Sequence, residues 1–584
     1  MPPPGVRYLS CFDAPMHSDI LRSNRGPEGD GPTVAALRWP ACSASGTRVT
    51  IDFAAHRAWP WHRRLVSAAV RRVRVWCRSA ADDRPTPVES AVDWLNRQPR
   101  SVGLAMRCGA PPCPGLTAAL LPTLLEFGQF ELLDAWLKWL LSAQRSDGSF
   151  TQAGTNDGSL FNTAEALVAL TELAAAGMAV AHEPAGCAAE CLNQRLADFS
   201  LAGTGGGRRL RTAVSVGCAN ALSAAGQWLG SKRWQQIAHD ILARSRGAVD
   251  WHLWTEPGRL VVQAADAWLT LGEVGLARDI LRWPSARQRR DGAVPATEHA
   301  NWGENDVLAH LSALWFRLGE RDRADRALAF LHRQQCSSGG WQQRWGRSLP
   351  TCESPWAVKH YLDAARLQVA TSFDEPHELP TAIAVNDGRL VAVRDWLATL
   401  GIAPKVADVG CGPGRFLREL ARVVPHARLI GIDPAPAMLR QLPGGIESRP
   451  GSLLRIPAGD GEFDGVFAVE SLEHSLLPER AVDELCRVVR PGGKILIIDK
   501  HRARQPLSLH QPWERWFLPE TVEHWMARHC GDLRVEPIAH GPAGDTGLFL
   551  CWHGTRRACA YASPAEVSGS VPKLARNSLI SPAA

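Results

Sequence analysis

The chain has 584 residues, of which 45% are hydrophobic and 21% charged, and its formal net charge is +6. This length is too great for one hydrophobic core, and the composition is that of an ordinary globular protein, so two or three domains are expected. The small net charge does not indicate a nucleic-acid-binding protein, whose basic residues gather on one face. No apolar run long enough to span a bilayer occurs, and the N-terminal residues lack the pattern of a signal peptide.

The 15 cysteines follow no repeated spacing and include no CxxC pair. This pattern predicts free thiols in a reducing cytoplasm rather than disulfides or a zinc site. We therefore expect a cytoplasmic protein without a structural metal.

Composition and periodicity change along the chain. The first residues are rich in Pro, Gly and Arg, a long helical pattern follows, and short apolar runs then alternate with helical segments, as in a parallel α/β sheet. We divide the chain into residues 1–85, irregular and arginine-rich; 86–371, helical; 372–390, a linker; 391–554, an α/β domain; and 555–584, a disordered tail.

A short motif recurs in the helical region, where a helix ends in Gln or Arg and a polar glycine turn leads to an apolar residue. Its copies are AQRSDGSF (143–150), RQRRDGAV (287–294) and RQQCSSGGW (333–341). Helical hairpins that bury one face only by stacking on their neighbours form solenoids or closed rings. The motif therefore predicts an all-α domain of stacked hairpins.

These turns resemble those of α/α-toroid proteins, namely the terpene-cyclase and prenyltransferase-repeat family and bacterial polysaccharide-cluster proteins of similar build. The resemblance implies an α/α toroid. The DxDD and DDxxD motifs that carry catalysis in that family are absent. We expect a role in packing or acceptor recognition, with a cyclase-like or carbohydrate-active toroid, and hence a bifunctional protein, as the alternative.

The segment VADVGCGPGRF (406–416) carries the clearest chemical signal. Its apolar start predicts a strand, its glycines a sharp turn, and the residues from Arg415 a helix. Gly410, Gly412 and Gly414 let the backbone approach a ligand closely, because no Cβ is in the way.

The next apolar run, RLIGID (428–433), ends in Asp433, about 23 residues after Gly410. An acidic residue at the end of a second strand can accept hydrogen bonds from both hydroxyls of a ribose. A nicotinamide enzyme is the first alternative, but its fingerprint is GxGxxG, and this loop reads GxGxG after an aspartate.

These motifs resemble those of the type-11 family of class I S-adenosylmethionine-dependent methyltransferases. Two further segments, 451–474 and 487–500, match the later motifs of that family in order and spacing. The resemblance implies a Rossmann-like domain that binds S-adenosyl-L-methionine, with Asp408 near the methionine amino group and Asp433 on the ribose. The cofactor-binding residues expected are Asp408, Gly410, Cys411, Gly412, Gly414, Asp433, Pro434, Ser452, Leu453 and Glu470.

The sequence departs from the family at one position. Members often carry an aspartate after the third strand that binds the adenine amino group, whereas here Ser452 is the nearest equivalent. A hydroxyl can do part of that work, with backbone contacts from Leu453.

Glu473 and His474 follow the fourth predicted strand, where a general base for an acceptor hydroxyl is expected. His474 could equally be a structural residue of the turn. With Glu470 the pair spells ExxEH, similar to a motif that accompanies a divalent metal in ubiquinone-pathway and RNA-terminal O-methyltransferases. A metal site remains an alternative there. We expect one of two roles for a further group of residues: they line the acceptor side of the site, or they belong to a surface helix packed on the toroid. These residues are Lys500, His501, Trp513, Arg515 and Trp516.

Residues 63–78 predict a helix with arginines along one face and apolar residues along the other. Such a helix could contact an anionic membrane surface or pack against the helical domain. A peripheral membrane contact is thus an open alternative to a wholly cytoplasmic location.

The sequence as a whole predicts a multidomain enzyme with an all-α, toroid-like domain and a Rossmann-like methyltransferase domain. The expected reaction is O-methylation of a glycan or glycolipid precursor, as the resemblance of both halves to polysaccharide-cluster proteins implies. A small aromatic or isoprenoid acceptor is the alternative. A non-catalytic scaffold is a further one.

Overall fold

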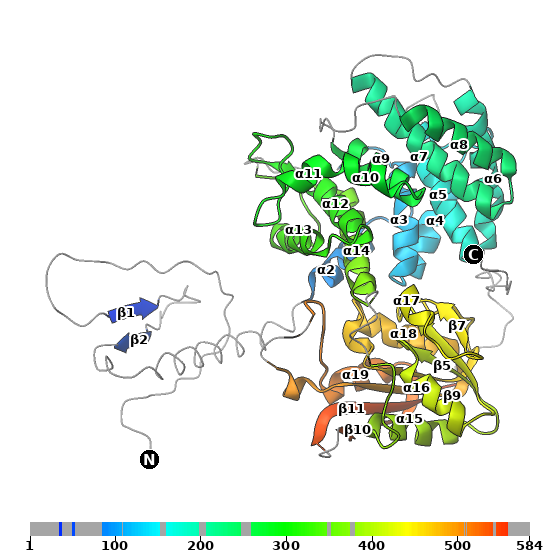
Figure 1. The fold of residues 1–584 in the computed structure, drawn as a ribbon, viewed down its shortest axis with the longest axis vertical. Helices are drawn as coiled ribbons and strands as arrows, with labels where there is room; N and C mark the ends of the chain where they lie inside the picture. Colours follow the sequence, from blue (N-terminus) through cyan, green and yellow to red (C-terminus); the bar gives the residue numbers. More distant parts are fainter. Residues whose placement is uncertain are drawn as a thin grey trace. The chain divides into compact units, whose positions relative to one another are not determined.

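The computed structural model describes residues 85–107, 109–151, 159–197, 206–246, 258–346, 352–373, 380–506, 509, 511–540 and 545–558 (Figure 1). In residues 1–84, which form a separate unit, it describes the antiparallel strands β1 (Val34–Leu37) and β2 (Val49–Asp52). The predicted basic helix at 63–78 and the tail beyond residue 558 lie outside the described residues. In the described part of the chain, no helix is both long and apolar enough to cross a membrane.

The region predicted to be helical folds into paired helices. One set packs side by side in the order α3, α5, α7, α9, α12 and α14, and α14 in turn contacts α3, so these inner helices close a ring. Each inner helix except α14 also packs against the outer helix that follows it in the chain, and α14 packs against α2. The helices are α2 (Pro87–Asn96), α3 (Pro114–Glu126), α4 (Phe130–Ser142), α5 (Leu160–Ala175), α6 (His182–Ala197), α7 (Gly206–Trp228), α8 (Lys232–Arg246), α9 (Gly258–Thr270), α10 (Val274–Ile280), α11 (Arg282–Arg287), α12 (Asn305–Arg317), α13 (Arg321–Gln334) and α14 (Pro355–Ser372).

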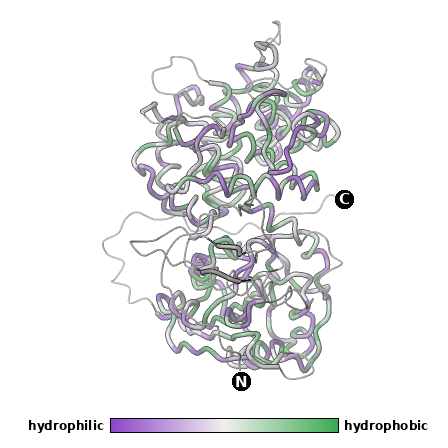
Figure 2. The backbone as a smooth tube through the Cα atoms, turned by 90° about the vertical axis from the view of Figure 1, so that its left-hand side faces the viewer, coloured by the Kyte–Doolittle hydropathy of each residue, from purple (hydrophilic) through white to green (hydrophobic). Residues whose placement is uncertain are grey.

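The ring is stabilised by apolar burial: outer helices such as α4 and α13 bury one face, whereas the inner helices α3 and α12 are buried almost all round. Hydrophobic and hydrophilic residues alternate along the helical part of the tube in Figure 2. Trp136, Trp268 and Trp315 are among the largest fully buried side chains, which explains part of the high tryptophan content.

The recurring glycine turn has the same geometry in its three copies. A glutamine side chain donates to the carbonyl of the turn glycine and to a backbone carbonyl of the next hairpin. Gln144 bonds Gly148 and Pro184, Gln288 bonds Gly292 and Arg323, and Gln335 bonds Gly339 and Pro87. Since Pro87 begins α2, the last copy ties the end of the helical region to its start.

The turn glycines have a positive φ and lie directly against the neighbouring hairpin. At Gly292, where φ is 97°, an added Cβ would lie 1.9 Å from the Arg326 carbonyl oxygen. A Cβ added at Gly148 or Gly339 would lie similarly close to the carbonyl oxygen of Cys187 or Ser90, respectively. The backbones can therefore pack at this distance only because these residues have no side chain.

Strands β3 (Gly303–Glu304) and β4 (Arg344–Trp345) form a short antiparallel pair within the helical region, and the strands from β5 onward form a seven-stranded sheet in the order β10-β11-β9-β8-β5-β6-β7. Strands β9, β8, β5, β6 and β7 are parallel, and β11 and β10 complete one edge in antiparallel pairing. The strands are β5 (Lys405–Val409), β6 (Arg428–Asp433), β7 (Glu447–Pro450), β8 (Phe463–Val469), β9 (Val489–Lys500), β10 (Cys530–His540) and β11 (Asp545–Arg556).

Helices accompany this sheet as expected of parallel strands joined by crossovers. They are α15 (Gly388–Ala398), α16 (Arg415–Val423), α17 (Pro436–Leu439), α18 (Pro478–Val488) and α19 (Pro519–Met526). The central strands are buried on both faces: Phe467 packs with Trp396 of α15, whereas Val466 and Ala468 belong to the other core cluster. The direction of chain progression reverses between β5 and β8, which is the switch point where open α/β sheets bind ligands.

We predict that Gly292→Ala lowers the stability of the helical region much more than Gly272→Ala. Both glycines have a positive φ, but an added Cβ at Gly272 meets nothing within 4 Å. The control should therefore cost only about 1–2 kcal/mol for the left-handed backbone, while Gly292→Ala must also separate two hairpins. Thermal unfolding followed by circular dichroism measures the difference, and equal losses would show that the close approach is unimportant.

Candidate cofactor and acceptor site

The glycine-rich loop between β5 and α16 lies at the carboxyl end of the sheet, beside the switch point. The backbone N–H groups of Gly410 and Cys411 both donate to the carbonyl of Ile432, at 2.8 and 3.1 Å. Gly410 has a φ of 80°, and a Cβ there would lie 2.4 Å from the Cβ of Ser471. At Gly412 an added Cβ meets nothing within 4 Å, so space for a ligand lies next to the backbone there.

Asp433 ends β6 and connects two loops. Its Oδ2 accepts from the N–H of Gly412 at 2.9 Å, and its Oδ1 accepts from the N–H of Ala435 at 2.9 Å. The carboxylate thus lies against the glycine loop, as the spacing of the two motifs predicts. Pro434, the next residue, is exposed.

Asp408 precedes the glycine loop and is 1% exposed, and its Oδ2 has no hydrogen-bond partner among the described residues. Burial, with the nearby charge of Asp433, raises its pKa well above the ordinary value, and Arg415 opposes the shift. A buried, unpaired carboxylate is a suitable partner for a cationic amino group. This site therefore fits the ammonium of a methionine moiety.

The loop after β7 adjoins this carboxyl end. The N–H of Gly451 donates to the Asp433 carbonyl at 3.2 Å, which places Ser452 and Leu453 close to Asp433. The Ser452 hydroxyl accepts from the N–H of Leu454 at 3.2 Å, and Leu453 is 8% exposed. The Ser452 hydroxyl therefore already stabilises the turn in which it lies.

Cys411 and Glu470, also predicted to bind the cofactor, are engaged elsewhere. The Cys411 side chain is buried in the core beneath the loop, so only its backbone is part of the surface of the loop. Glu470, with a φ of 52°, pairs with Arg389 of α15 and accepts from Arg415 at 2.5 Å. This carboxylate thus holds the first residue of α16 in place.

A buried cluster of charged residues follows β8 and β9. Glu473 is 1% exposed, and its N–H donates to Asp499 Oδ2 at 3.0 Å. Burial and the mutual repulsion of the two carboxylates raise the pKa of Glu473, and burial raises that of Asp499. Lys500 Nζ lies 2.8 Å from Glu473 Oε1, so an ammonium stands beside the two carboxyl groups and opposes the rise in the pKa of Glu473.

His474 lies next to this cluster in a short helical turn (Leu472–His474). Its Nε2 is 3.4 Å from Glu473 Oε1, and its ring packs edge-on against Phe373, with centroids 5.1 Å apart. Burial lowers its pKa to about 4, with a smaller opposing effect from Glu514. The imidazole is therefore neutral at physiological pH, and its Nδ1 has no partner among the described residues.

The segment 513–516 folds back onto these residues. Glu514 Oε1 accepts from Lys500 at 3.1 Å and from Trp516 Nε1 at 2.8 Å, and the Lys500 ammonium lies 5.3 Å from the Trp516 ring. The Arg515 N–H donates to the Glu473 carbonyl at 2.9 Å. Lys500 and Trp516, predicted together to line the acceptor side, thus lie in one cluster with Glu514, whose charge also acts on His474. His501, by contrast, pairs by its backbone with Leu548.

Sequence reasoning missed Asp499, Glu514 and Phe373. An aspartate inside the apolar run of β9 was a signal for Asp499, because a charged residue within a buried strand needs a partner. The other two come from segments distant in sequence, and no local pattern marks them.

The comparisons with known proteins agree with this geometry. The model of a methyltransferase domain family, Methyltransf_11, matches residues 407–497. A ubiquinone biosynthesis O-methyltransferase of a Methylobacterium species is 31% identical over 185 residues, which cover 26% of this chain and 74% of the relative. The chain belongs to the class I S-adenosylmethionine-dependent methyltransferases.

Two other relatives are also similar to part of this chain. A trans-aconitate 2-methyltransferase of an Azoarcus species is 34% identical over 26% of this chain and 59% of its own length. The O-methyltransferase cnsE of Penicillium expansum is 31% identical over 22% of this chain and 49% of its own length. The chain thus spans about half to three quarters of these curated relatives, and the matches cover no more than 26% of this methyltransferase.

The ExxEH segment does not gather into a metal site in this methyltransferase. Glu470 is bound by two arginines, while Glu473 pairs with Lys500. Among the described residues, no group of three His, Cys, Asp or Glu side chains is arranged to hold a metal ion.

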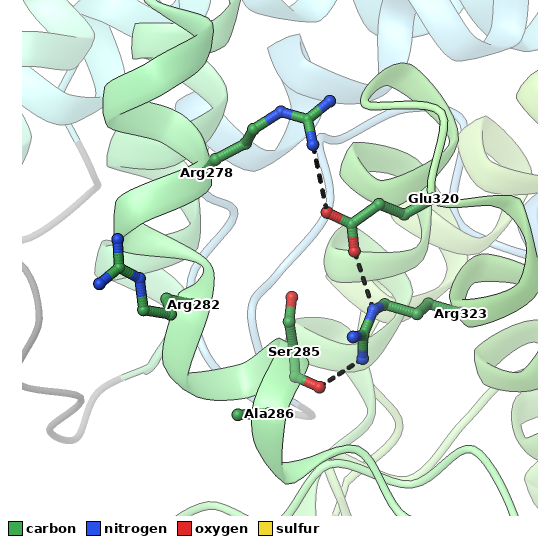
Figure 3. Close-up of a pocket in the computed structure, with 6 residues that line it drawn as sticks. All are labelled: Arg278, Arg282, Ser285, Ala286, Glu320 and Arg323. Carbon is green, nitrogen blue, oxygen red and sulfur yellow. Dashed lines mark hydrogen bonds and ion pairs between the residues drawn. The ribbon is translucent and has the colours of Figure 1, made fainter.

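A surface pocket lies between α10, α11 and α13, far from these strands in the chain (Figure 3). Its arginines are already paired: Arg323 Nε lies 2.9 Å from Glu320, and Arg278 donates to the Leu318 carbonyl at 2.9 Å. These side chains join helix ends, which gives them a structural role at this surface.

We predict that Asp408→Asn stabilises the fold and weakens cofactor binding. A carboxyl whose pKa is raised by folding costs stability above its ordinary pKa, so removing the charge should raise the melting temperature by about 2–4 °C for each kcal/mol relieved. Loss of the charged hydrogen bond should weaken S-adenosylmethionine binding about tenfold or more. Calorimetric titration and thermal melting measure both effects, with the exposed Asp395→Asn as control; tight binding by Asp408→Asn would contradict the role given to Asp408.

We also predict a pH effect on stability from His474. Its folded-state pKa of about 4 lies below the unfolded value of about 6.5. The stability is therefore fully present above pH 6.5 and declines as the pH falls toward 4, because the unfolded chain takes up the proton first. His474→Gln should flatten this part of the stability profile, measured by urea unfolding at several pH values; an unchanged slope would place His474 in contact with solvent.

Proposed function

We propose that this methyltransferase transfers the methyl group of S-adenosylmethionine to a hydroxyl oxygen of an acceptor bound at the carboxyl ends of β8 and β9. The observation that carries the proposal is the neutral His474 imidazole beside the Glu473, Asp499 and Lys500 cluster, close in the sheet to the glycine loop. The names of two relatives, an O-methyltransferase in each case, are consistent with oxygen as the acceptor atom.

The residues divide the work as follows. The cofactor supplies an electrophilic methyl group on a sulfonium, so the protein needs mainly to hold the acceptor in line and accept its proton. His474 Nδ1 takes the proton of the acceptor hydroxyl as the oxygen bonds to the methyl carbon. Glu473, buried against Lys500, orients the imidazole rather than contacting the acceptor.

The cofactor site favours catalysis over a scaffold role. Asp408 is kept buried with its Oδ2 unpartnered, and the Asp433 carboxylate is held by one N–H of the glycine loop and one of the loop after β6. Such costly arrangements serve little purpose in a domain that binds no ligand.

The acceptor that we propose is a glycan or glycolipid precursor. We further infer that the ring of helices is an α/α toroid of the terpene-cyclase and prenyltransferase-repeat type, because its inner helices close on themselves and its glycine turns are equivalent. A small aromatic acceptor is the second candidate. Phe373 and Trp516, which flank His474 and Lys500, favour it.

We predict that Asp433→Ala abolishes cofactor binding and methyl transfer together. The carboxylate is the group expected on the ribose hydroxyls, so calorimetry should show micromolar binding to the wild type and none to the variant, while the exposed Asp395→Ala binds normally. Transfer of a labelled methyl group is then screened with nucleotide sugars, polyprenyl-linked glycans and phenols. Products stable to esterase but cleaved by ether-cleaving reagents identify O-methyl ethers.

Absence of cofactor binding to the wild type would favour the scaffold instead. Transfer to phenols alone would select the aromatic acceptor. Transfer that survives Asp433→Ala would place catalysis in the helical domain.

A further inference from the structure

The cofactor site of the methyltransferase extends over three neighbouring strands. Asp408 is on β5, Asp433 ends β6, and β7 lies on the far side of β6 from the glycine loop. With the methionine ammonium at Asp408 and the ribose at Asp433, the base of the cofactor extends along the carboxyl edge of the sheet toward the end of β7. The N–H of Gly451, directly after β7, donates to the Asp433 carbonyl at 3.2 Å. The turn that follows, residues 452–455, is therefore the surface that the adenine meets.

This turn is closed by two backbone hydrogen bonds between its first and last residues. The Ser452 N–H donates to the Arg455 carbonyl, and the Arg455 N–H donates to the Ser452 carbonyl, both at 3.1 Å. The Ser452 hydroxyl is bonded within the turn, to the N–H of Leu454. Recognition of the base thus depends on where the whole turn lies, and whatever holds Arg455 also holds Ser452.

The side chain of Arg455 reaches the helical ring. Its Nη1 donates to Oε1 of Glu126, the last residue of α3, which is 329 residues away in the chain. The two side chains are 35% and 27% exposed, so water screens this ion pair only in part. The other carboxylate oxygen of Glu126 lies 4.0 Å from Arg366 of α14. Glu126 is therefore held from the side of the ring while it binds the turn.

The end of α3 also lies against the backbone of the turn. Gly128, two residues after Glu126, has a φ of 64°, and an added Cβ there would lie 3.0 Å from the Leu454 carbonyl oxygen. Leu453 and Leu454 belong to the same apolar core as Leu124 of α3. The turn thus continues the core of the ring, and the ion pair fixes its orientation.

A second bond joins the ring to the methyltransferase domain at another element. Arg480 of α18 donates to the Gly128 carbonyl at 2.9 Å. Arg480 and Arg455 both contribute to the docking of the two domains, but the position of the turn depends on Arg455. The two arginines therefore allow these effects to be separated by experiment.

We propose that the helical ring forms part of the cofactor site: Glu126 is a positioning residue that, through Arg455, holds the turn 452–455 where it receives the adenine of S-adenosylmethionine. The inference rests on the placement of the cofactor in the proposed function and is independent of the acceptor. A turn that is already fixed loses less conformational entropy when the base binds. The contact with the ring thereby compensates for the serine at position 452.

Calorimetric titration of the full chain with two ligands tests the proposal. S-adenosylhomocysteine carries the adenine, the ribose and an ammonium, whereas 5′-methylthioadenosine lacks the ammonium, and its affinity is measured by competition. Glu126→Met and Arg455→Met should each weaken binding of both ligands about fivefold, the effect of an ion pair of this exposure. The double variant should bind no more weakly than either single one, because both changes remove the same interaction. Arg455→Lys, which keeps the charge, should retain most of the affinity.

Two further variants serve as controls. Arg480→Met is matched to Arg455→Met and should bind both ligands as the wild type does. Asp408→Asn should weaken binding of S-adenosylhomocysteine alone, because 5′-methylthioadenosine has no ammonium to contact it. All variants at the ring contact should melt within a few degrees of the wild type, since they remove one partly exposed ion pair or hydrogen bond.

Three results would overturn the inference while leaving the cofactor site in place: unchanged binding by Glu126→Met and Arg455→Met when Asp433→Ala has lost it, an equal loss in Arg480→Met, or a loss confined to S-adenosylhomocysteine. The second would reduce the contact to domain docking, and the third would place its effect on the methionine side. Absence of binding of either ligand to the wild type would instead refute the proposed function, and the inference with it.

Discussion

The cofactor site depends on the two hydrogen bonds that the Asp433 carboxylate accepts. One N–H comes from Gly412, in the loop after β5, and the other from Ala435, in the loop after β6. The parallel register of these strands pairs Val409 with Ile432, so both loops start at the same level of the sheet. A side chain with two acceptor oxygens can then hold them together. The shape of the glycine loop is thus set by a residue outside it, and the positions of Asp408 and Gly412 follow.

Three sets of buried carboxyl groups in the described part of the α/β domain have surroundings that differ in an instructive way. Asp433 is compensated by backbone N–H groups, Asp499 by the backbone N–H of Glu473, and Glu473 by Lys500. Asp408 has no partner for one oxygen. Proteins keep such unfavourable arrangements where function requires them and stabilise the rest of the fold in compensation. An external cation is therefore the best explanation for the unpartnered oxygen of Asp408.

Features whose determinants lie close together in the sequence could be predicted, whereas contacts between residues far apart in the sequence could not. The strand, the glycine turn and the start of the helix at Arg415 are confirmed, because all their determinants lie within 406–416. The periodicity of the first large region predicted helices, and helices are what the structure has there. The hydrogen bond of Glu470 with Arg389, 81 residues away, by contrast, was not predicted. The closure of the ring depends on Gln335 and Pro87, 248 residues apart. No local pattern reports such contacts.

Glu89 of α2 connects the helical region with the segment 513–516. Its Oε2 accepts from the Thr86 N–H in the capping box of α2, and its Oε1 accepts from Arg515 at 2.6 Å. Arg515 in turn donates its backbone N–H to the Glu473 carbonyl. A short chain of bonds therefore runs from the first helix of the ring to the residue that orients His474. Because coupling requires an element with two arrangements, these bonds argue for a fixed position of the 513–516 segment rather than for transmission of a signal. The ring would then serve catalysis by holding this segment rigid.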